Sequence, residues 1–105
     1  MRENEYQQEL KKRIKSRIPD CIVIKNDPSF QQGFPDLAIF KGDRYAILEV
    51  KRSKEASHQP NQDYYVDLMN DWSYSAFIYP ENEKEILDEL QRALEPRGSS
   101  CISEP

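Results

Sequence analysis

Residues 34–51, FPDLAIFKGDRYAILEVK, predict how this chain folds. Two mainly apolar runs, 34–40 and 45–51, flank the sequence Lys41-Gly42-Asp43-Arg44. Short runs rich in β-branched and aromatic residues favour strands, and a glycine-containing polar pair between two such runs favours a tight turn. We therefore predict two strands joined as a β-hairpin, with Pro35 tolerated only near the start of the first strand or at a sheet edge.

The predicted hairpin carries charged residues at positions that should otherwise be apolar. Asp36 lies in the first run, and Glu49 stands between Leu48 and Val50 in the second. An unpaired carboxylate at such a position costs free energy unless a cation or another partner compensates it. The hairpin can bring both acids level on neighbouring strands, and residues two apart on a strand share a face, so Lys51 points with Glu49. We predict one cluster of Asp36, Glu49 and Lys51.

N-terminal to the hairpin, the pattern favours a helix and then a strand. The helix is predicted over residues 4–18, because apolar side chains recur there at four-residue steps: Tyr6, Leu10, Ile14 and Ile18. Pro19 and Asp20 end it. Residues 21–24 form a short β-branched run typical of a strand, and residues 26–29 form a turn.

C-terminal to the hairpin, we predict a helix at 60–70, a strand at 75–79 and a helix at 81–94. Pro60 suits the first turn of its helix, where the missing N–H costs nothing. The element order α-β-β-β-α-β-α predicts an α/β fold, in which helices flank a mixed four-stranded sheet and a C-terminal helix is added. A chain of 105 residues fits a single domain, here 1–96, followed by a flexible tail at 97–105.

The predicted cluster has the composition that phosphodiester hydrolysis requires. Two carboxylates, with a backbone carbonyl, suit Mg²⁺ or Mn²⁺. Such an ion polarises a phosphate and acidifies a bound water. Lys51 would orient that water or stabilise charge on the phosphoryl oxygens.

The same residues carry a family resemblance. Pro35-Asp36, followed at the spacing seen here by Glu49-Val50-Lys51, resembles the signature of the PD-(D/E)XK nuclease superfamily. The superfamily includes restriction enzymes, Holliday-junction resolvases and the VRR-NUC domains of phages. Together with the element order, the resemblance covers residues from about 3 to 80. The chain departs from the VRR-NUC name, because Val50-Lys51-Arg52 stands where that string would be.

The resemblance implies a restriction-endonuclease-like α-β-β-β-α-β core and a Mg²⁺- or Mn²⁺-dependent deoxyribonuclease. Its substrate would be DNA, with branched or junction DNA as one form, its assembly a homodimer, and its origin a phage or prophage. Asp36 and Glu49 would be metal ligands, the backbone carbonyl of Val50 would complete the shell, and Lys51 would be catalytic.

The resemblance also implies helper residues on the flanking helices. Glu3 would be a further catalytic and metal-binding acid; it shares the side of the helix that carries Tyr6, which favours it over Glu5 and Glu9. Gln62, or alternatively Gln59, would assist on the following helix. We expect Arg52 and Lys54 to contact DNA phosphates. His58, in the loop, has no required role.

Composition limits the other functional classes. The net charge of −4 argues against binding nucleic acid by bulk electrostatics, but a bound cation adds positive charge that the count omits. No run approaches the roughly 20 apolar residues of a membrane span, and no secretory signal is present, so we expect a cytoplasmic protein. Cys21 and Cys101 indicate neither a disulfide framework nor a zinc cluster, and Cys21 should be a small buried hydrophobe.

Two other functions remain open from the sequence. One is a catalytically inactive DNA-binding or assembly module that keeps the same fold. The other is an interaction protein whose acidic C-terminal helix, with residues 81–95, is the working surface.

Overall fold

The computed structural model describes residues 2–27, 29 and 31–95, and these form an α/β structure with three α-helices and one mixed four-stranded sheet. The elements are α1 (Glu3–Arg17), β1 (Ile22–Lys25), β2 (Leu37–Lys41), β3 (Arg44–Val50), α2 (Pro60–Trp72), β4 (Tyr74–Ile78), the 3₁₀ turn η1 (Pro80–Asn82) and α3 (Glu83–Ala93). The strand order is β1-β2-β3-β4. Only β3 and β4 are parallel, and α2 connects them. The predicted element order is confirmed.

The predicted hairpin joins β2 to β3. Lys41 pairs with Arg44, and the register runs back to Leu37 opposite Leu48. Gly42, the first of the two turn residues, has φ +60°. Glycine adopts positive φ without the steric cost of a Cβ, so the Gly-Asp pair allows the tight connection.

The predicted start of β2 at residue 34 is wrong, because β2 begins at Leu37. The backbone N–H of Asn26 donates to the carbonyl of Asp36 at 2.7 Å. The Asn26 side-chain amide donates to the carbonyl of Pro35, also at 2.7 Å. Asn26 therefore closes the loop between β1 and β2 at its base, and Pro35, which has no N–H to donate to a ladder, lies before the strand.

The other boundaries differ by a few residues from the prediction. The helix α2 continues to Trp72, and the last helix starts at Glu83 after the separate turn η1. The predicted tail at 97–105, with Cys101, lies outside the residues that the structure describes. No helix in residues 2–27, 29 and 31–95 is long and apolar enough to span a bilayer.

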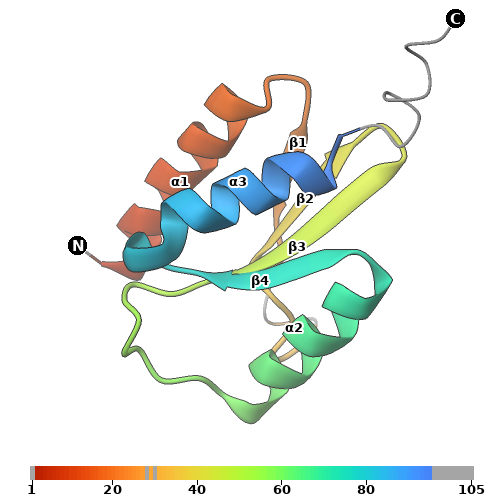
Figure 1. Cartoon of the computed structure of the whole chain (residues 1–105). Coiled ribbons are helices and arrows are strands. Elements are labelled where there is room, and N and C mark those ends of the chain that lie inside the picture. The colour runs from red at the N-terminus through yellow and green to blue at the C-terminus, as the bar shows by residue number, and fades with distance from the viewer. Residues whose placement is uncertain (1, 28, 30, 96–105) are drawn as a thin grey trace, which may run out of the picture.

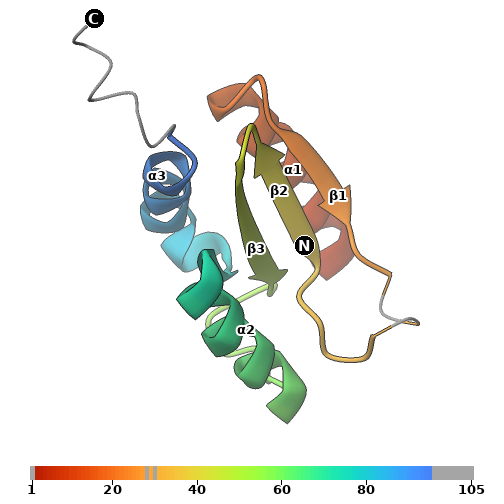
Figure 2. The same cartoon turned by 90° about the vertical axis from the view of Figure 1, so that its right-hand side faces the viewer.

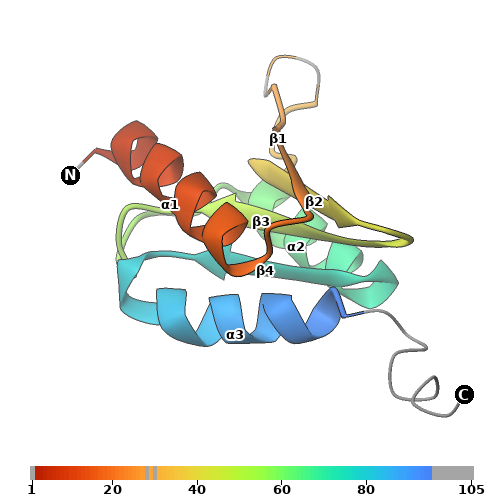
Figure 3. The same ribbon diagram turned by 90° about the horizontal axis from the view of Figure 1, so that it is seen from above.

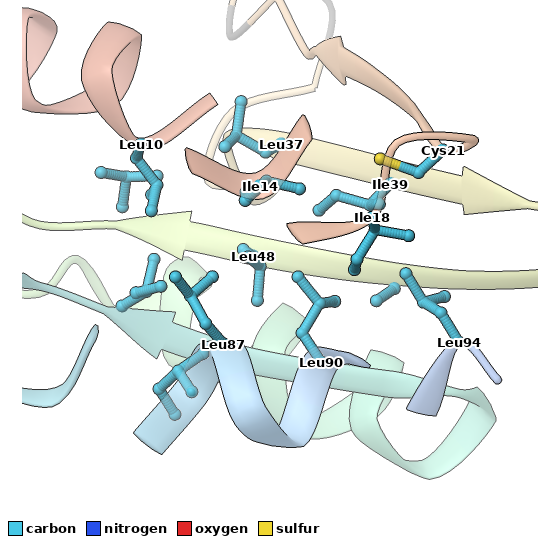
Figure 4. Packing of buried hydrophobic residues seen from close by; sticks show 14 of the residues in the cluster. Leu10, Ile14, Ile18, Cys21, Leu37, Ile39, Leu48, Leu87, Leu90 and Leu94 are labelled. Atoms are coloured by element: carbon cyan, nitrogen blue, oxygen red, sulfur yellow. The ribbon is translucent and has the colours of Figure 1, made fainter. Parts of the chain in front are cut away.

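Helices cover both faces of the sheet. Figure 1 shows α1 and α3 side by side on one face and α2 on the other, and Figure 3 shows α2 behind the strands when α1 and α3 are in front. Figure 4 shows the side chains that fill the space beneath α1 and α3. This larger core has the following buried members: Tyr6, Leu10, Ile14, Ile18, Cys21, Leu37, Ile39, Ala46, Leu48, Val50, Ile78, Ile86, Leu87, Leu90 and Leu94. The expected burial of Cys21 is thus confirmed.

The face under α2 has a smaller core, which consists of Ala38, Ile47 and Met69 with Phe34 and Tyr45 packed against it. Successive residues of a strand alternate between the two faces of a sheet. The odd-numbered positions of β3 therefore face α2, whereas the even-numbered positions face α1 and α3. This alternation puts Glu49 on the α2 face.

Part of the α2 face lies beyond the helix and is open. The edge strand β1, at the border of the sheet in Figure 2, exposes Ile22 by 59% and Ile24 by 47%. Phe40, which pairs with Ile22, is 43% exposed. The sheet thus has an uncovered apolar strip along β1 and β2.

Polar side chains hold α1 and α3 together above the larger core. The hydroxyl of Tyr6 donates to Glu83 at 2.8 Å, and the Arg13 guanidinium donates to both oxygens of the same carboxylate. One turn further along α1, Arg17 donates to Asp88 and Gln91. These contacts set how the two helices lie relative to each other.

Candidate active site

Asp36 and Glu49 come together at one end of the hairpin. Because Leu37 pairs with Leu48, the residues just beyond this pair, Asp36 and Glu49, come opposite each other. The half-buried carboxylate of Asp36 accepts a hydrogen bond from the backbone N–H of Val50 at 2.9 Å. This bond holds Asp36 across the strands from Glu49.

Lys51 lies beside the two acids, as predicted. Its ammonium Nζ is 3.6 Å from Glu49 Oε2, and the side chain is almost completely buried. The backbone N–H of Lys51 donates to the carbonyl of Ile78 at 2.9 Å, which continues the pairing of β3 with β4. The end of the parallel strand pair therefore fixes the position of Lys51.

Gln62, in the first turn of α2, connects Lys51 to that helix. Its Oε1 accepts hydrogen bonds from Lys51 Nζ at 2.8 Å and from the backbone N–H of Gln59 at 3.0 Å. Since both donors need an oxygen acceptor, the orientation of the amide is set and Nε2 points away from them. Between the two predicted glutamines, Gln62 is the one that contacts Lys51.

The electrostatics of Glu49 are unusual. Only 3% of the residue is exposed. Burial, reinforced by the charge of Asp36, raises the pKa of Glu49 to about 8, although the Lys51 charge acts in the opposite direction. Burial also raises the pKa of Asp36, against the effect of the Val50 hydrogen bond. Two adjacent carboxylates in a buried position cannot both ionise easily without a cation.

A divalent cation fits this donor set. The Oε1 atom of Glu49 is buried and has no hydrogen-bond partner among the residues that the structure describes. A buried acceptor without a partner is costly, and a cation would remove that cost. Oxygen donors from two carboxylates and a carbonyl are those that Mg²⁺ and Mn²⁺ prefer. Asp36 and Glu49 therefore supply a chemically suitable partial shell, and the carbonyl of Val50 remains the further donor expected from the sequence.

Glu3 stands at the border of the site. It is exposed at the start of α1, lines a pocket of about 290 Å³ with Lys51 and Gln62, and its charge acts on Glu49. Glu5 instead accepts from the backbone N–H of Arg2 at 3.0 Å, and Glu9 lies 3.8 Å from Lys12. Glu3 is thus the acid of α1 that faces the site.

The structure does not hold Glu3 in position to act with Asp36 and Glu49 as a third acidic ligand. Across residues 2–27, 29 and 31–95, no three His, Cys, Asp or Glu side chains come close enough together to hold a metal ion. The start of α1 places Glu3 in the wall of the pocket, whereas Asp36 directly precedes β2 and Glu49 lies in β3. The structure therefore brings two acids together and leaves Glu3 apart from them.

The expected DNA contacts lie next to the site. Arg52 is exposed and lines the 290 Å³ pocket. Lys54 is exposed in the following loop, and its backbone N–H donates to Glu81 at 3.2 Å. Both side chains can therefore reach outward from a loop whose backbone is anchored beside β4.

His58, in the same loop, contacts residues of two neighbouring elements. Its ring stacks on Phe77 with the centroids 4.0 Å apart, and Nδ1 lies 3.0 Å from Asp63 Oδ1. These contacts join the loop to β4 and α2.

Two further polar residues were not predicted from the sequence. Gln7 is 5% exposed, one turn after Glu3 on α1. Its spacing from Glu3 was a usable signal, because residues four apart share a helix face. Asn26, which closes the loop before Asp36, gave no such signal, because a turn pattern does not show which carbonyl a side chain will reach.

Comparisons of the chain with protein-family models, curated proteins and solved structures find no match. The geometry of Asp36, Glu49, Lys51 and Gln62 therefore carries the functional argument.

Proposed function

We propose that this protein is a Mg²⁺- or Mn²⁺-dependent deoxyribonuclease of the PD-(D/E)XK type with a restriction-endonuclease-like core. The observation that carries the proposal is the buried, unpartnered oxygen of Glu49 next to Asp36 and Lys51. Two acids and one cation at the end of two neighbouring strands match what phosphodiester hydrolysis requires. The element order and the Asp36 to Lys51 motif support the same assignment.

Asp36, Glu49 and the backbone carbonyl of Val50 would hold the ion. When bound, the ion would supply Lewis-acid activation of the phosphate and of a water. The Val50 N–H keeps Asp36 in place. Ionised Glu49 and Asp36 would then share a cation, whose charge offsets the effect of burial that raises their pKa values.

Lys51 would act on the substrate directly. Its ammonium is held by Gln62 and lies close to Glu49, so it can donate a hydrogen bond to the attacking water or to a non-bridging phosphate oxygen. Gln62 is a positioning residue, because it acts through Lys51. Arg52 and Lys54 would contact flanking phosphates, and Glu3 would act from the pocket wall.

The test combines metal binding with cleavage. Purified protein is titrated with Mn²⁺ by calorimetry and incubated with supercoiled, single-stranded and branched DNA in Mg²⁺, Mn²⁺ or EDTA. We expect metal-dependent cleavage that Glu49→Gln and Lys51→Met each reduce by at least about 100-fold, and metal binding that only Glu49→Gln abolishes. Glu55→Gln and Lys84→Met, at exposed positions, are the matched controls. Equal cleavage by Glu49→Gln would refute the proposal.

A catalytically inactive DNA-binding or assembly module is the second candidate. The lack of a three-acid cluster in the described ranges favours it. In that case the protein would bind the same DNA substrates in a gel-shift assay, and no metal would produce cleavage.

We also propose that the nuclease acts as a homodimer, because one site cuts one strand and a duplex has two. Sedimentation equilibrium with and without a DNA duplex tests this assembly. A monomer under both conditions would exclude it.

A further inference from the structure

A second pocket lies beside the candidate active site, between the loop before β2 and the first turn of α2. It has a volume of about 420 Å³ and is lined by Gln32, Gly33, Gln59, Pro60, Asn61 and Gln62. The volume falls in the range of roughly 300 to 1,000 Å³ that is typical of small-molecule sites. Four of the lining residues carry side-chain amides and none carries a charge. The pocket therefore offers neutral hydrogen-bond donors and acceptors.

This amide pocket adjoins the pocket that contains Lys51. Gln59 and Gln62 line both the amide pocket and the 290 Å³ pocket that contains Lys51 and Arg52. The Oε1 of Gln62 is engaged by Lys51 and by the backbone of Gln59. Its Nε2 makes no hydrogen bond within the described part of the chain, so it is available to a ligand in the amide pocket that Gln62 lines.

The walls of the amide pocket are held in place. Phe34 and Tyr65 contact edge to face with ring centroids 5.3 Å apart, and the Gln31 amide donates to the Tyr65 hydroxyl at 2.5 Å. Gly33, at φ +85°, packs so tightly against Asn61 that an added Cβ would overlap the Asn61 side chain. The loop is thus fastened to α2, and the pocket exists before a ligand binds.

We propose that the amide pocket binds one nucleobase of the strand being cut, next to the scissile phosphate. This inference rests on the proposed nuclease function and deepens it. The amides of Gln32 and Asn61 and the Nε2 of Gln62 would hydrogen-bond the edge of the base. Phosphate is a poorer ligand for this pocket, because an ionised phosphate only accepts hydrogen bonds and would leave the side-chain amide oxygens without a donor. A side-chain amide presents a donor and an acceptor together, as the edge of a base does.

A concave pocket selects a base that is not stacked within a duplex. A stacked base shows its edge only in a groove, where a protruding protein element can reach it. Single strands offer free bases without the cost of unstacking. Single-stranded oligonucleotides are therefore the appropriate probe.

The first experiment measures binding without catalysis. Fluorescence anisotropy with 12-nucleotide dA, dC, dG and dT strands, and with a strand that is abasic throughout, is carried out in EDTA. We expect wild-type affinities to differ by about tenfold between the best and the worst base, as one amide–base contact provides. We expect Asn61→Leu and Gln32→Leu to reduce this difference to less than about twofold. Both residues are exposed, so the fold should persist, and thermal melting checks this.

Gln8→Leu, at an exposed position of α1 away from the pocket, is the matched control and should keep the base preference. Equal wild-type affinity for all five strands would overturn the proposal. An unchanged base preference in both pocket variants would overturn it as well.

A comparison of base-selective binding with DNA cleavage distinguishes failure of the pocket proposal from failure of the nuclease proposal. If base-selective binding depends on Asn61 and Gln32 but no metal produces cleavage, the pocket is established and the nuclease is not. If the protein cleaves DNA through Glu49 and the pocket variants keep the wild-type base preference, the nuclease stands and the pocket proposal fails. If no strand binds and none is cut, both fail.

Discussion

At the scale of single residues, Glu49 has conflicting requirements. Burial and the neighbouring Asp36 favour its protonated form at neutral pH, whereas a metal ligand must be ionised. The native state without metal therefore holds a proton that the unfolded chain releases near pH 4.5, the ordinary pKa of the group. Between that value and about 8, the folded state binds more protons than the unfolded state, so raising the pH favours unfolding.

We therefore predict that, in EDTA, the melting temperature falls as the pH rises from 5 to 8. The window is chosen because the lowered pKa values of Asp27 and Asp88 act on stability below it. Glu49→Gln should have a smaller slope, and Mg²⁺ should raise the wild-type melting temperature most at the upper end. Differential scanning fluorimetry measures both effects. A melting temperature of wild-type protein that rises across the window would contradict the prediction.

A second residue-scale prediction compares two glycines. Gly33 and Gly42 both have positive φ, but a Cβ at Gly33 would overlap Asn61, whereas a Cβ at Gly42 would meet nothing within 4 Å. Gly42→Ala should cost about 1–2 kcal/mol in the free energy of unfolding, from the backbone alone. Gly33→Ala should cost more, by about 1–3 kcal/mol of steric overlap. Urea denaturation compares the two, and equal losses would show that the loop moves away from α2 freely.

At the scale of elements, Glu83 receives several of the polar contacts between α1 and α3. Glu83 receives the Tyr6 hydroxyl and the Arg13 guanidinium, and the Arg13 charge also lies over the Tyr6 ring, 5.8 Å from its centroid. Burial, together with the bond to Glu83, raises the pKa of Tyr6 and keeps its hydroxyl as a donor. The orientation of α3 on the sheet thus follows from contacts that span the two ends of the described chain.

We predict that Glu83→Ala lowers the free energy of unfolding by about 2 kcal/mol, the scale of hydrogen bonds to a charged group that is partly shielded from water. Glu85→Ala is the control, because Glu85 also lies in the first turn of α3 but is exposed. It should cost less than about 0.5 kcal/mol. Chemical denaturation gives both values, and a similar cost for the two variants would assign the effect to the helix dipole alone.

The sequence predicts the positions of some elements better than others. The hairpin follows from Gly42 and the two apolar runs, which are local, and its position was predicted well. The start of β2 was not, because the hydrogen bonds of Asn26 to Pro35 and Asp36 cross a loop. The partners of Glu83 could not be predicted either, since apolar periodicity does not show which polar side chains of two helices meet.

At the scale of the whole molecule, the two faces of the sheet are packed unequally. The face under α1 and α3 holds the larger core, whereas α2 rests on a core centred on Ala38, Ile47 and Met69. The candidate site and the amide pocket both lie on the α2 side. Fewer buried apolar contacts mean a lower free energy for local opening.

We predict that backbone amides of α2 exchange with deuterium faster than those of α1 near Leu10 and α3 near Leu90. Hydrogen exchange followed by mass spectrometry measures this order under native conditions. Mn²⁺ or a bound oligonucleotide should slow exchange in the first turn of α2. Uniform protection across the three helices would show that the molecule opens only as a unit.

Part of the candidate site could be predicted from the alternation of side chains along the strands. Asp36, Glu49 and Lys51 follow from strand alternation and hairpin register, both of which are encoded locally. The bond from the Val50 N–H to Asp36 could not be predicted, because strand alternation does not show which backbone group a side chain reaches. The bond from Lys51 to Gln62 could not be predicted either, because it depends on how α2 packs on the sheet.

The shared acceptor on Gln62 also limits how this chain can diverge over evolution. A glutamate at that position would keep an oxygen for Lys51 and for the Gln59 backbone, but it would replace the Nε2 donor with a second acceptor. Descendants with glutamate there would retain the hydrogen bond from Lys51 but change which ligands the amide pocket can bind. A leucine would lose both the oxygen acceptor and the Nε2 donor. Position 62 should therefore vary only between glutamine and glutamate wherever the lysine persists.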